Sequence, residues 1–594
     1  MSSNMFTHIS KYISLGAKTG GLAALLLAAT LDGTSVLAQQ QDQQQVPVAQ
    51  PVSYVSTDPD DRLQELEQTV AQQQASLQAQ QVQVQKLVEQ LQIAGGSATG
   101  GAADASAAAP DAPKGYVVGS DRAMAGAYGP GGPVFSTKNG DFKFHPRGLV
   151  QADIIAPGPP GALGGINNLQ TQDAFTFRRL RLGADGTMYD NIDYVFEVDL
   201  AFALQNVDPG NSAAPATGLR SVGNAAGASG QGGNTINVIQ PTTIFMTFKE
   251  IPVLGNIRVG NQQDWISFEH IESARFLDFM ERSPIMDAFF GPNNNGYIPG
   301  VSFFRTTENQ RANIQMGAYH NSVYDSGYTY DIGSGAWIGG GRGTWCPYYD
   351  EASNGRYMVH TAMGAEYRTF NSQLAAGQDG DNVRVRSRGV LRQTSSTLDL
   401  NYVDTGNFYA RSQTCLCPEF VWQHGPLLVQ AEYAYSNFGG AATSKGGKSL
   451  GNVAFNGGYV EVLYFLTGEN RQYNRQSGVF DRVVPFQNAF STRTGQFGWG
   501  AWQPGWRVDW LDLNSGNPGQ IGVHGGQELD NTFGINWFLN SNARFQMNYV
   551  LTHVDNAAQV AQAAGGVANA ALAGSRPIGN GYLQSVGIRM DFNW

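Results

Sequence analysis

The sequence has little charge, few cysteines and, after residue 38, no long apolar run. Charged residues make up 14% of its 594 residues, against about 25% in an average soluble chain. Three cysteines exclude a disulfide scaffold, and the net charge of −11 lacks the basic surplus of a nucleic-acid binder. Because no later apolar run reaches the length of a membrane-spanning helix, a helical membrane protein is also excluded.

Glycine and aromatic residues are abundant instead. The chain has 74 Gly, and 11% of its residues are aromatic. Low charge, many aromatic side chains, much Gly and Asn, and a mean hydropathy of −0.27 are typical of a transmembrane β-barrel. The sequence contains no Gly-rich phosphate loop, no HExxH motif and no nucleophile motif between a strand and a helix. We therefore expect no enzyme, no cofactor and no metal site.

The N-terminus predicts export. Lys11 and Lys18 precede an apolar stretch over residues 21–31, and small residues follow up to Ala38. This order is that of a secretory signal peptide, here residues 1–38, and its apolar core is too short for an anchor helix. Residues 39–57 are rich in Gln, Pro and Val, which predicts a disordered lead-in. The expected location of the protein is the bacterial outer membrane.

Residues 58–93 carry a heptad pattern. From Leu63 to Leu91 the seam positions alternate at spacings of three and four and are Leu or Val except for Gln73 and Gln80, which predicts a coiled coil in the periplasm. The chain offers no second heptad segment, so the expected partner is another copy of the same chain, and the alternative is a single Gln-rich helix. Residues 94–139 are rich in Ala, Gly and Ser and predict a flexible linker.

From residue 140 to 594 the sequence alternates with period two. Ile192, Tyr194 and Phe196 share one face of a strand, while Asp193 and Glu197 lie on the other. Similar stretches predict an all-β fold, an antiparallel transmembrane barrel of about sixteen strands around an aqueous channel. Charged residues in mid-strand favour a water-filled lumen over the alternative, a soluble sandwich. The predicted strands begin near residues 142, 175, 192, 244, 257, 297, 312, 356, 382, 396, 427, 457, 505, 531, 543 and 582.

Several segments resemble one porin family. Residues 175–183 (FTFRRLRLG) with 193–199, residues 257–262 with 267–269 and 279–283, and the closing 587–594 resemble the phosphate-selective porin O and P family. The likeness covers roughly residues 140–300 and the last strand, and the final Trp594 departs from the Phe that is more usual in the family. The resemblance implies a trimeric, sixteen-stranded porin in outer-membrane lipid, with Arg and Lys in the lumen for small anions.

Arginines are the candidate anion ligands. Arg384, Arg386 and Arg388 follow one another at i, i+2 and i+4, so on a strand they share a face at a spacing of roughly 6.5–7 Å. The planar guanidinium fork binds phosphate oxygens in pairs, and we expect passive diffusion of phosphate or polyphosphate. The alternative is that these arginines bind acidic lipid headgroups or pair with carboxylates. The remaining pore-lining candidates are Arg179 and Arg181, in register with each other, together with Arg258 and Arg275.

Residues 264–295 break the alternation and combine charged with aromatic residues. We predict a loop that folds inward and narrows the pore, with Glu269, Glu281 and Arg282 as candidate residues. The carboxylates of Glu269, Glu272, Asp278, Glu281 and Asp287 depart from a purely anion-selective constriction. The alternative is that ion pairs pin the loop to the wall, and for Glu281 and Arg282 this alternative is preferred.

Two further features have open interpretations. Cys346, Cys415 and Cys417 lie in loop-like sequence of an exported protein, which predicts one disulfide from Cys346 to Cys415 or Cys417. The aromatic content also fits a general-diffusion or carbohydrate channel on the same fold. In that channel Trp499, Trp502, Trp506 and Trp510 would stack on sugar rings. A third hypothesis is a structural tether, in which the coiled coil binds peptidoglycan or periplasmic proteins.

Overall fold

The structure is a computed structural model that describes most of the predicted barrel. The described residues are 117–158, 173–201, 239–290, 296–320, 337–370, 381–392, 401–491, 495–516, 522–556 and 580–594, with the backbone of 219–220 and 235–236. They belong to one compact unit, Lys114–Trp594. The predicted signal peptide, lead-in and coiled coil lie outside the described residues. Within the described ranges, no helix has the length and apolarity to cross a membrane.

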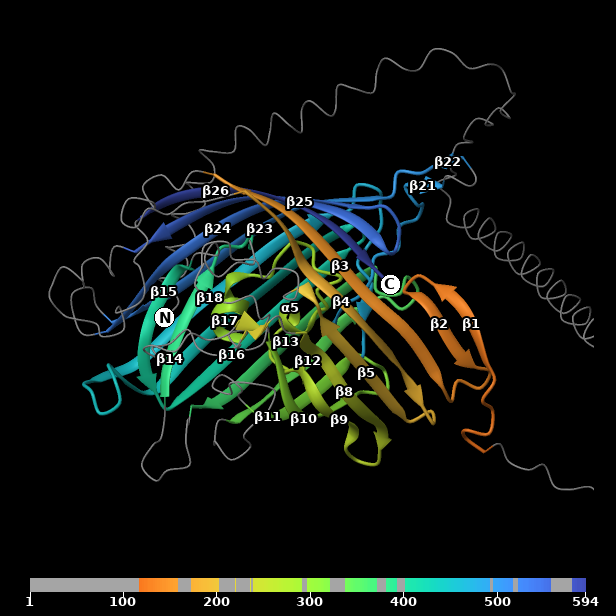
Figure 1. Cartoon of the computed structure of the whole chain (residues 1–594), viewed down its shortest axis with the longest axis horizontal. Helices are drawn as coiled ribbons and strands as arrows, with labels where there is room; N and C mark the ends of the chain where they lie inside the picture. The colour runs from red at the N-terminus through yellow and green to blue at the C-terminus, as the bar shows by residue number, and fades with distance from the viewer. Residues whose placement is uncertain are drawn as a thin grey trace, which may run out of the picture. The chain divides into compact units, whose positions relative to one another are not determined.

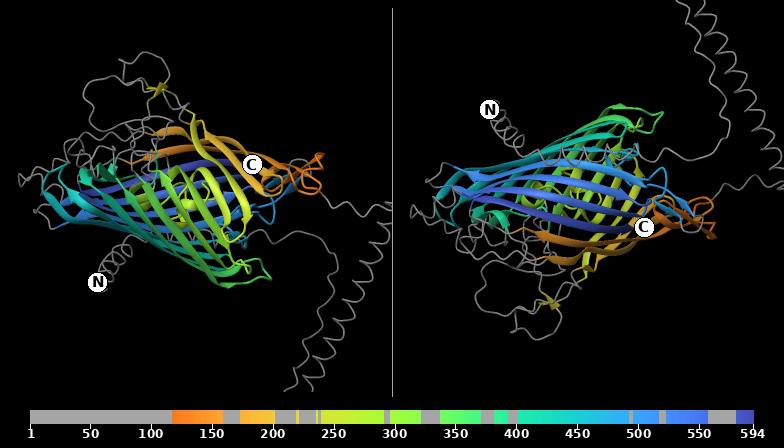
Figure 2. Two further views of the ribbon diagram at one scale, coloured as in Figure 1. Left: turned by 90° about the horizontal axis from the view of Figure 1, so that it is seen from below. Right: turned by 90° about the horizontal axis from the view of Figure 1, so that it is seen from above.

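Sixteen antiparallel strands form the wall, and the last strand pairs with the first to close it. This confirms the predicted fold class. Figures 1 and 2 show the strands as a tilted ring with α5 (Phe268–Ile271) inside it. The wall strands are β3 (Lys143–Pro157), β4 (Ala174–Met188), β5 (Ile192–Asp199), β8 (Gln240–Ile251), β9 (Gly255–Gln263), β10 (Tyr297–Thr306), β11 (Ala312–His320), β12 (Trp337–Tyr349), β13 (Tyr357–Thr369), β16 (Ser412–His424), β17 (Leu427–Ala442), β18 (Ser449–Tyr464), β23 (Ala501–Ser515), β24 (Val523–Phe538), β25 (Ala543–Asp555) and β26 (Gly581–Asn593).

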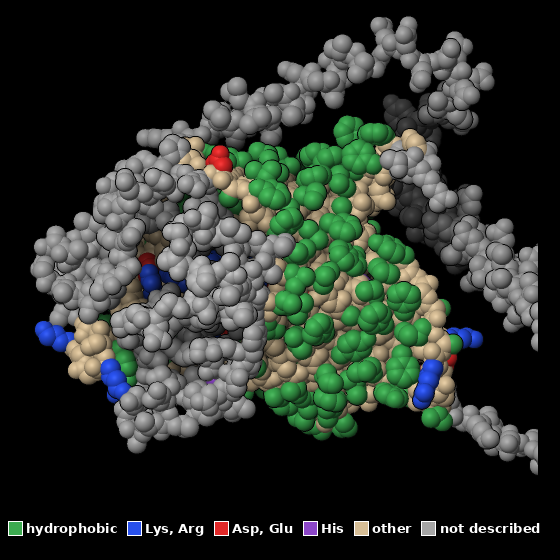
Figure 3. All heavy atoms as spheres, viewed as in Figure 1, with side chains coloured by type: hydrophobic (Ala, Val, Ile, Leu, Met, Phe, Trp, Pro, Cys, Tyr) green, Lys and Arg blue, Asp and Glu red, His purple; other side chains and the backbone are tan. Residues whose placement is uncertain are grey.

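The wall is apolar outside and polar inside, the reverse of a soluble protein. On β24, Phe533 and Ile535 are exposed. Asp530, Thr532 and Asn536, at the alternate positions of the same strand, are buried. Successive side chains of a strand point to opposite faces, so the alternating sequence places apolar residues on the outer surface. Figure 3 shows these apolar side chains over the visible wall, with Lys and Arg at its two ends.

Two of the sixteen predicted wall strands are wrong. The patterns near residues 382 and 396 belong to a hairpin, β14 (Asp381–Arg388) and β15 (Asn401–Ala410). This hairpin is not part of the wall, because β13 pairs directly with β16. The wall strands that the prediction missed are β12 and β16. Glycines at 339, 341 and 343 leave β12 little apolar alternation, and a Cys-Leu-Cys-Pro run gives β16 the appearance of a loop.

The end of the predicted linker is also structured. Within residues 94–139, β1 (Met124–Gly129) and β2 (Gly132–Thr137) form a hairpin that pairs with the start of β3. A Cβ on Gly132 would lie 3.0 Å from the Cβ of Trp594. The hairpin therefore packs against the C-terminal residue, and the flexible-linker prediction is wrong for residues 124–137. One further pair, β6 (Leu219–Arg220) with β7 (Thr235–Ile236), lies outside the wall.

Short turns join the strands at one end of the barrel, for example 189–191, 252–254 and 425–426, and longer connections join them at the other. Short turns face the periplasm in outer-membrane barrels. Three connections depart from this plan and enter the barrel. They are the loop between β9 and β10, which holds α5 and a π-helical turn, η3 (Met286–Phe290); the β14–β15 hairpin; and the first half of the segment 465–500, which holds β19 (Tyr473–Asn474) and β20 (Val479–Phe480). The second half of that segment holds β21 (Phe490–Ser491) and β22 (Gln496–Phe497), which project outside the ring of wall strands (Figure 1).

Candidate functional site

The inner loop, residues 264–290, rests on glycines of the wall. Added Cβ atoms at Gly505 of β23 and Gly534 of β24 would lie 3.3 and 2.9 Å from the ring of Phe279. One at Gly587 of β26 would lie 2.9 Å from the sulfur of Met280. Because a side chain at these positions would occupy the place of the loop, the glycines set how closely the loop approaches the wall.

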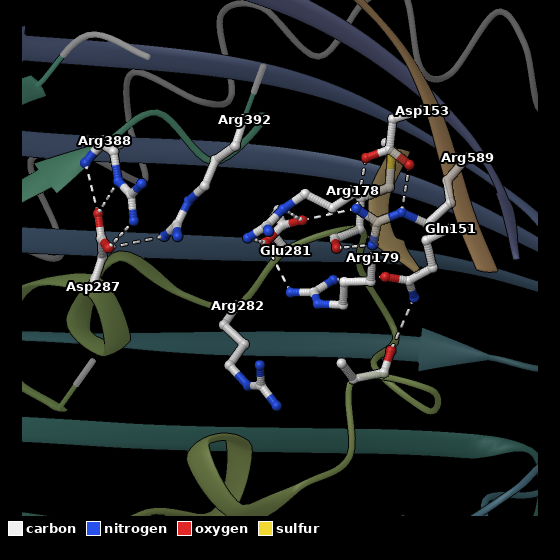
Figure 4. Close-up of polar contacts among 12 residues, drawn as sticks. Gln151, Asp153, Arg178, Arg179, Glu281, Arg282, Asp287, Arg388, Arg392 and Arg589 are labelled. Carbon is white, nitrogen blue, oxygen red and sulfur yellow. Dashed lines mark hydrogen bonds and ion pairs between the residues drawn. The ribbon is translucent and has the colours of Figure 1, made fainter. Parts of the chain in front are cut away.

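Glu281 pins the inner loop to the wall on the side of β4 and β26. Its oxygens lie 2.8 Å from Nε of Arg178, 3.3 Å from Arg179 and 2.7 Å from Arg589. Arg589 is also paired with Asp153 of β3 at 2.7 Å, as Figure 4 shows. The predicted pinning role of Glu281 agrees with this geometry.

Arg178 is a functional candidate that the sequence analysis missed. Strict alternation with Arg179 would point it outward. However, the pairing of β3 with β4 shifts at this place, where Gln151 faces Arg179 and Ala152 faces Phe177. Such a bulge leaves one residue without a partner and turns its side chain. Both Arg178 and Arg179 therefore reach Glu281 inside the barrel. An Arg-Arg pair within an apolar strand is the one signal in the sequence that could have indicated the bulge.

Arg181 and Arg275 are buried in a shared ion-pair cluster. Arg181 binds Asp199 at 3.0 Å and approaches Glu197 to 3.6 Å. Arg275 of the inner loop pairs with the same Glu197 and so ties the loop to β5. Arg179 and Arg181 are both buried on the inner face of β4. Their charges, however, are turned toward carboxylates.

The β14 arginines lie on the open face of the inner hairpin. Val383 and Val385, on the opposite face, pack in the apolar core with Phe408 of β15. Arg388 binds Asp287 of the inner loop at 2.7 Å, and Arg384 pairs with Asp404 of β15. The third member, Arg386, is exposed and makes no ion pair within the described part of the chain.

Beyond the predicted triplet, Arg392 approaches Asp287 to 3.4 Å. In Figure 4 it lies between Arg388 and the group around Glu281. The guanidinium groups of Arg178, Arg179, Arg388, Arg392 and Arg589 thus contact three carboxylates, those of Asp153, Glu281 and Asp287 (Figure 4). Arg392 carried no alternation signal because it follows the end of β14.

Arg258 of β9 lies among aromatic rings. Its Cζ lies 4.0 Å from the ring centre of Phe245, 4.9 Å from that of Phe304 and 5.3 Å from that of Trp265. Its Nε donates to Thr247 Oγ1 at 3.2 Å. It makes no ion pair with another described residue, so cation–π contacts replace the usual carboxylate partner.

Glu269 and Arg282 have different roles in the structure. Glu269 pairs with Arg507 of β23 at 3.2 Å and accepts the Ser283 amide proton at 2.9 Å, so it joins the loop to the wall. Arg282 donates to the carbonyl oxygens of Glu269 and Glu272 at 2.7 and 2.5 Å. Both acceptors belong to the inner loop, so the predicted wall contact of Arg282 is wrong; this arginine braces the loop internally.

Arg471, in the segment 465–500, holds the inner loop from the periplasmic side. Its guanidinium lies 2.5 Å from Glu272 and 2.5 Å from Asp278. Its amide N–H donates to Gln423 of β16 at 3.0 Å. Arg342 of β12 donates to the carbonyl oxygen of Gly478 at 2.9 Å and holds the same segment against the wall. No pattern in the sequence indicated this segment, because its contacts lie far along the chain.

Burial shifts the pKa values of the loop carboxyl groups. Desolvation raises the pKa of Glu269 to about 7 and that of Glu272 to about 8, and neighbouring carboxylates add to the rise while Arg507 and Arg471 oppose it. Burial acts in the same direction on Asp287, but Arg392 and Arg388 outweigh it and lower the pKa of that group. Neighbouring arginines, Arg178 first among them, likewise lower the pKa of Glu281, so Asp287 and Glu281 are loop carboxylates that hold their charge firmly.

Accessibility distinguishes the two signs of charge. The exposed fraction of the side chain is 32% for Arg388 and 7% for its partner Asp287. It is 24% for Arg384 against 9% for Asp404. For Arg178 it is 11%, and for Glu281 it is 3%. In these ion pairs the guanidinium group faces the water and the carboxylate lies behind it.

The cysteines do not form the predicted disulfide. Cys346 lies on β12, and Cys415 and Cys417 lie on β16, so none is in a loop; all three are free and buried. Strand β13 separates β12 from β16. Two strand spacings amount to roughly 9.5 Å, which is beyond the separation that a disulfide spans. The error follows from missing β12 and β16 as strands.

The tryptophans do not line the lumen. Trp502, Trp506 and Trp510 alternate with the buried residues of β23 and lie on its outer face. Their positions remove the support that these residues gave to sugar stacking inside the channel. Trp499 precedes β23 and is 78% exposed.

A closed barrel of sixteen strands, with an apolar outer face, a polar interior and a loop folded inside it, defines an outer-membrane porin. The chain belongs to the phosphate-selective porin O and P family, whose sequence model matches residues 163–573. This membership and the barrel fold point to a channel rather than an enzyme.

Individual relatives are distant. Porin O of Pseudomonas aeruginosa is 22% identical over 448 residues, which cover 72% of this chain and 86% of the relative. An uncharacterised protein of Caulobacter vibrioides is 25% identical over 426 residues, 71% of this chain and 70% of the other. Among solved structures, an anion-selective porin from Comamonas acidovorans matches 76% of this chain and all of its own, with 9% identity and a TM-score of 0.41.

Proposed function

We propose that this porin conducts small anions, phosphate or polyphosphate among them, from the outer side of the membrane to the periplasm along its arginines. The observation that carries the proposal is the unequal exposure within three ion pairs of the inner loop and the inner hairpin, Arg388–Asp287, Arg384–Asp404 and Arg178–Glu281. A solute that passes these pairs meets guanidinium groups, because the carboxylates are covered. A local field of this kind selects ions even when the net charge of the protein is negative.

Neighbouring arginines also explain how an anion would leave each site. Arg384, Arg386 and Arg388 share one face of β14, and Arg392 and Arg178 lie close to the same path (Figure 4). Carboxylate partners occupy part of the guanidinium forks of Arg384, Arg388, Arg392 and Arg178, which weakens the hold of these forks on a passing anion. Conduction requires several binding sites of moderate strength rather than one strong site.

A planar-bilayer measurement tests the proposal. Under a KCl gradient we expect a reversal potential that shows Cl⁻ preference, and we expect added phosphate to reduce the Cl⁻ current. A general-diffusion channel would show little preference and no reduction by phosphate, and that result would refute the proposal.

Substitution then tests the arginines themselves. Replacing Arg384, Arg386 and Arg388 together by Gln is expected to reduce the Cl⁻ preference and the phosphate effect, whereas Lys at the same positions is expected to keep the preference and weaken the effect of phosphate. Lysine keeps the charge but cannot bind two oxygens with a planar fork. Arg305→Gln, in an exposed residue beside a short turn, is the matched control. An unchanged triple Gln variant would exclude these residues from the path.

We further propose a homo-oligomer, with a trimer as the expected form. The support is the predicted coiled coil at 58–93, which needs a partner helix to bury its apolar seam. Sedimentation of the full chain and of a variant that lacks residues 58–93 measures how much the predicted coiled coil contributes to oligomer formation. Loss of envelope integrity with unchanged conductance in the same variant would support the tether hypothesis.

A further inference from the structure

The segment 465–500 divides into an inner and an outer half. Its first half reaches into the barrel through Arg471. Its second half contains the β21–β22 hairpin, and we call the described residues of this half, 484–491 and 495–499, the paddle. Figure 1 shows β21 and β22 projecting outside the ring of wall strands. Neither the channel path nor the ion pairs described above involve the paddle.

The paddle presents large apolar side chains to the surroundings. The exposed fraction is 85% for Phe497, 78% for Trp499 and 67% for Phe486, and about half of Phe490 is exposed. Over residues 484–499 the sequence has a single charged residue, Arg493. A water-soluble surface rarely gathers apolar side chains in this way without a partner.

The paddle is continuous with the aromatic row of the outer wall. Trp502 of β23 stacks on Trp537 of β24 with ring centres 5.0 Å apart, and Trp537 in turn stacks on Phe545 of β25 at 6.2 Å. Phe490 of the paddle lies 5.8 Å from Trp537, edge to face. The paddle therefore extends the row of rings beyond the wall.

Hydrogen bonds fix this arrangement. The indole N–H groups of Trp502 and Trp537 both donate to the carbonyl oxygen of Trp499, at 3.0 and 2.9 Å. Aromatic residues at the ends of barrel strands lie at the level of the lipid headgroups, where Trp has an apolar body in lipid and a polar N–H near water. Here the two wall tryptophans direct their N–H groups to the paddle, which places Trp499 at the same level.

We propose that the paddle inserts its aromatic side chains into the periplasmic leaflet of the outer membrane and anchors the segment 465–500 to phospholipid. Short turns mark this end of the barrel as the periplasmic one. The row of Trp502, Trp537 and Phe545 already contacts the lipid there, so the same lipid covers the paddle. The inner half of the segment, with Arg471, is thereby held between the membrane surface and the inner loop.

Fluorescence quenching by brominated lipids tests the anchor on the full-length protein in phosphatidylethanolamine–phosphatidylglycerol vesicles. Since the chain has 10 Trp, the emission of Trp499 is obtained as the difference between wild type and Trp499→Phe. The matched control is Trp506→Phe. Trp506 lies on the outer face of the same wall, further from the turn end, and stacks on Phe533. Both substitutions are conservative, and heat-modified mobility on gels verifies that each variant folds.

We expect most of the Trp499 emission to be lost with lipids brominated near the headgroup end of the acyl chain. The Trp506 emission is expected to be lost with bromines further along the chain. If bromolipids leave the Trp499 emission intact while aqueous iodide quenches it, the paddle lies in water and the proposal is wrong. If neither agent quenches Trp499, protein covers the paddle, and that result also overturns lipid anchoring. In both cases Trp506 must still be quenched by the lipid.

Discussion

Replacing Gly364 by Ala is predicted to lift the inner loop from the wall. Gly364 lies on β13, facing inward, and a Cβ there would stand 1.7 Å from the carbonyl oxygen of Ile266. An ordinary contact begins at 3.4 Å, so the loop backbone must move by about 1.7 Å relative to the strand. Rotation of a side chain cannot relieve this clash, because a backbone atom forms one side of it.

The displacement acts directly on the anchor of α5. One residue beyond Ile266, the hydroxyl of Ser267 donates to Glu432 at 2.6 Å, and the amide of Glu269 donates to the same carboxylate at 2.8 Å. A shift of about 1.7 Å takes both contacts outside hydrogen-bonding range. Overpacking of this kind costs about 1–3 kcal/mol. That cost raises the population of the displaced loop roughly 5- to 150-fold.

Single-channel recording in a planar bilayer measures the effect. Gly364→Ala is expected to add conductance levels and brief transitions, because the loop leaves its wild-type position more often. The control is Gly339→Ala on the outer face of β12, where an added Cβ meets nothing within 4 Å. If a folded Gly364→Ala protein shows the same levels and noise as the Gly339→Ala protein, the glycine contacts do not position the loop.

Three further predictions concern the same interior. Burial raises the pKa of Glu269 to about 7 and that of Glu272 to about 8, so protonation of these groups stabilises the attached position of the loop. This stabilisation is fully present below the ordinary carboxyl pKa and is lost as pH rises through 7 to 8. We expect the current noise to rise over that pH range. In Glu272→Gln the noise should depend less on pH, whereas the exposed control Glu351→Gln should keep the wild-type dependence on pH. Arg471→Gln is expected to produce noise at neutral pH, since it releases two loop carboxylates; a quiet channel would contradict this. Finally, the three cysteines should resist maleimide until the protein is unfolded, with the same gel mobility with and without reductant, and a mobility change would indicate a disulfide.

The sequence predicted the wall well because lipid and water impose opposite demands on its two faces. The period-two pattern is strong wherever outward positions are apolar, as in β24 with Phe533 and Ile535. It fails where outward positions are glycine, as in β12, whose outer face includes Gly339 and Gly343. The inner hairpin produced the opposite error. Its Val383 and Val385 pack against the core as a wall strand would, so alternation alone could not distinguish an inner strand from a wall strand.

The candidate site was predictable only in part. The inner loop and Glu281 were indicated by composition, because a charged and aromatic segment without alternation interrupts the strands. Arg178 depended on a bulge, which the register of two strands determines and one strand alone does not reveal. Arg471 depended on a contact with Glu272 that spans 199 residues of chain. Interactions of this kind arise from closure of the barrel and leave no local pattern.

Under the proposed function, the carboxylates of Asp287 and Glu281 in the inner loop would support anion passage rather than oppose it. A guanidinium group in a narrow lumen repels its neighbours and would turn toward open water or outward if nothing held it. Asp287 binds the guanidinium group of Arg388, and Glu281 binds that of Arg178. Both arginine side chains remain partly exposed to the lumen while these contacts hold them in place. Removing such a carboxylate therefore has two opposed effects on anion passage. The local charge becomes more positive, but the arginines that the carboxylate held become less ordered. We expect the loss of order to dominate in Glu281→Gln, because Glu281 fixes three guanidinium groups at once.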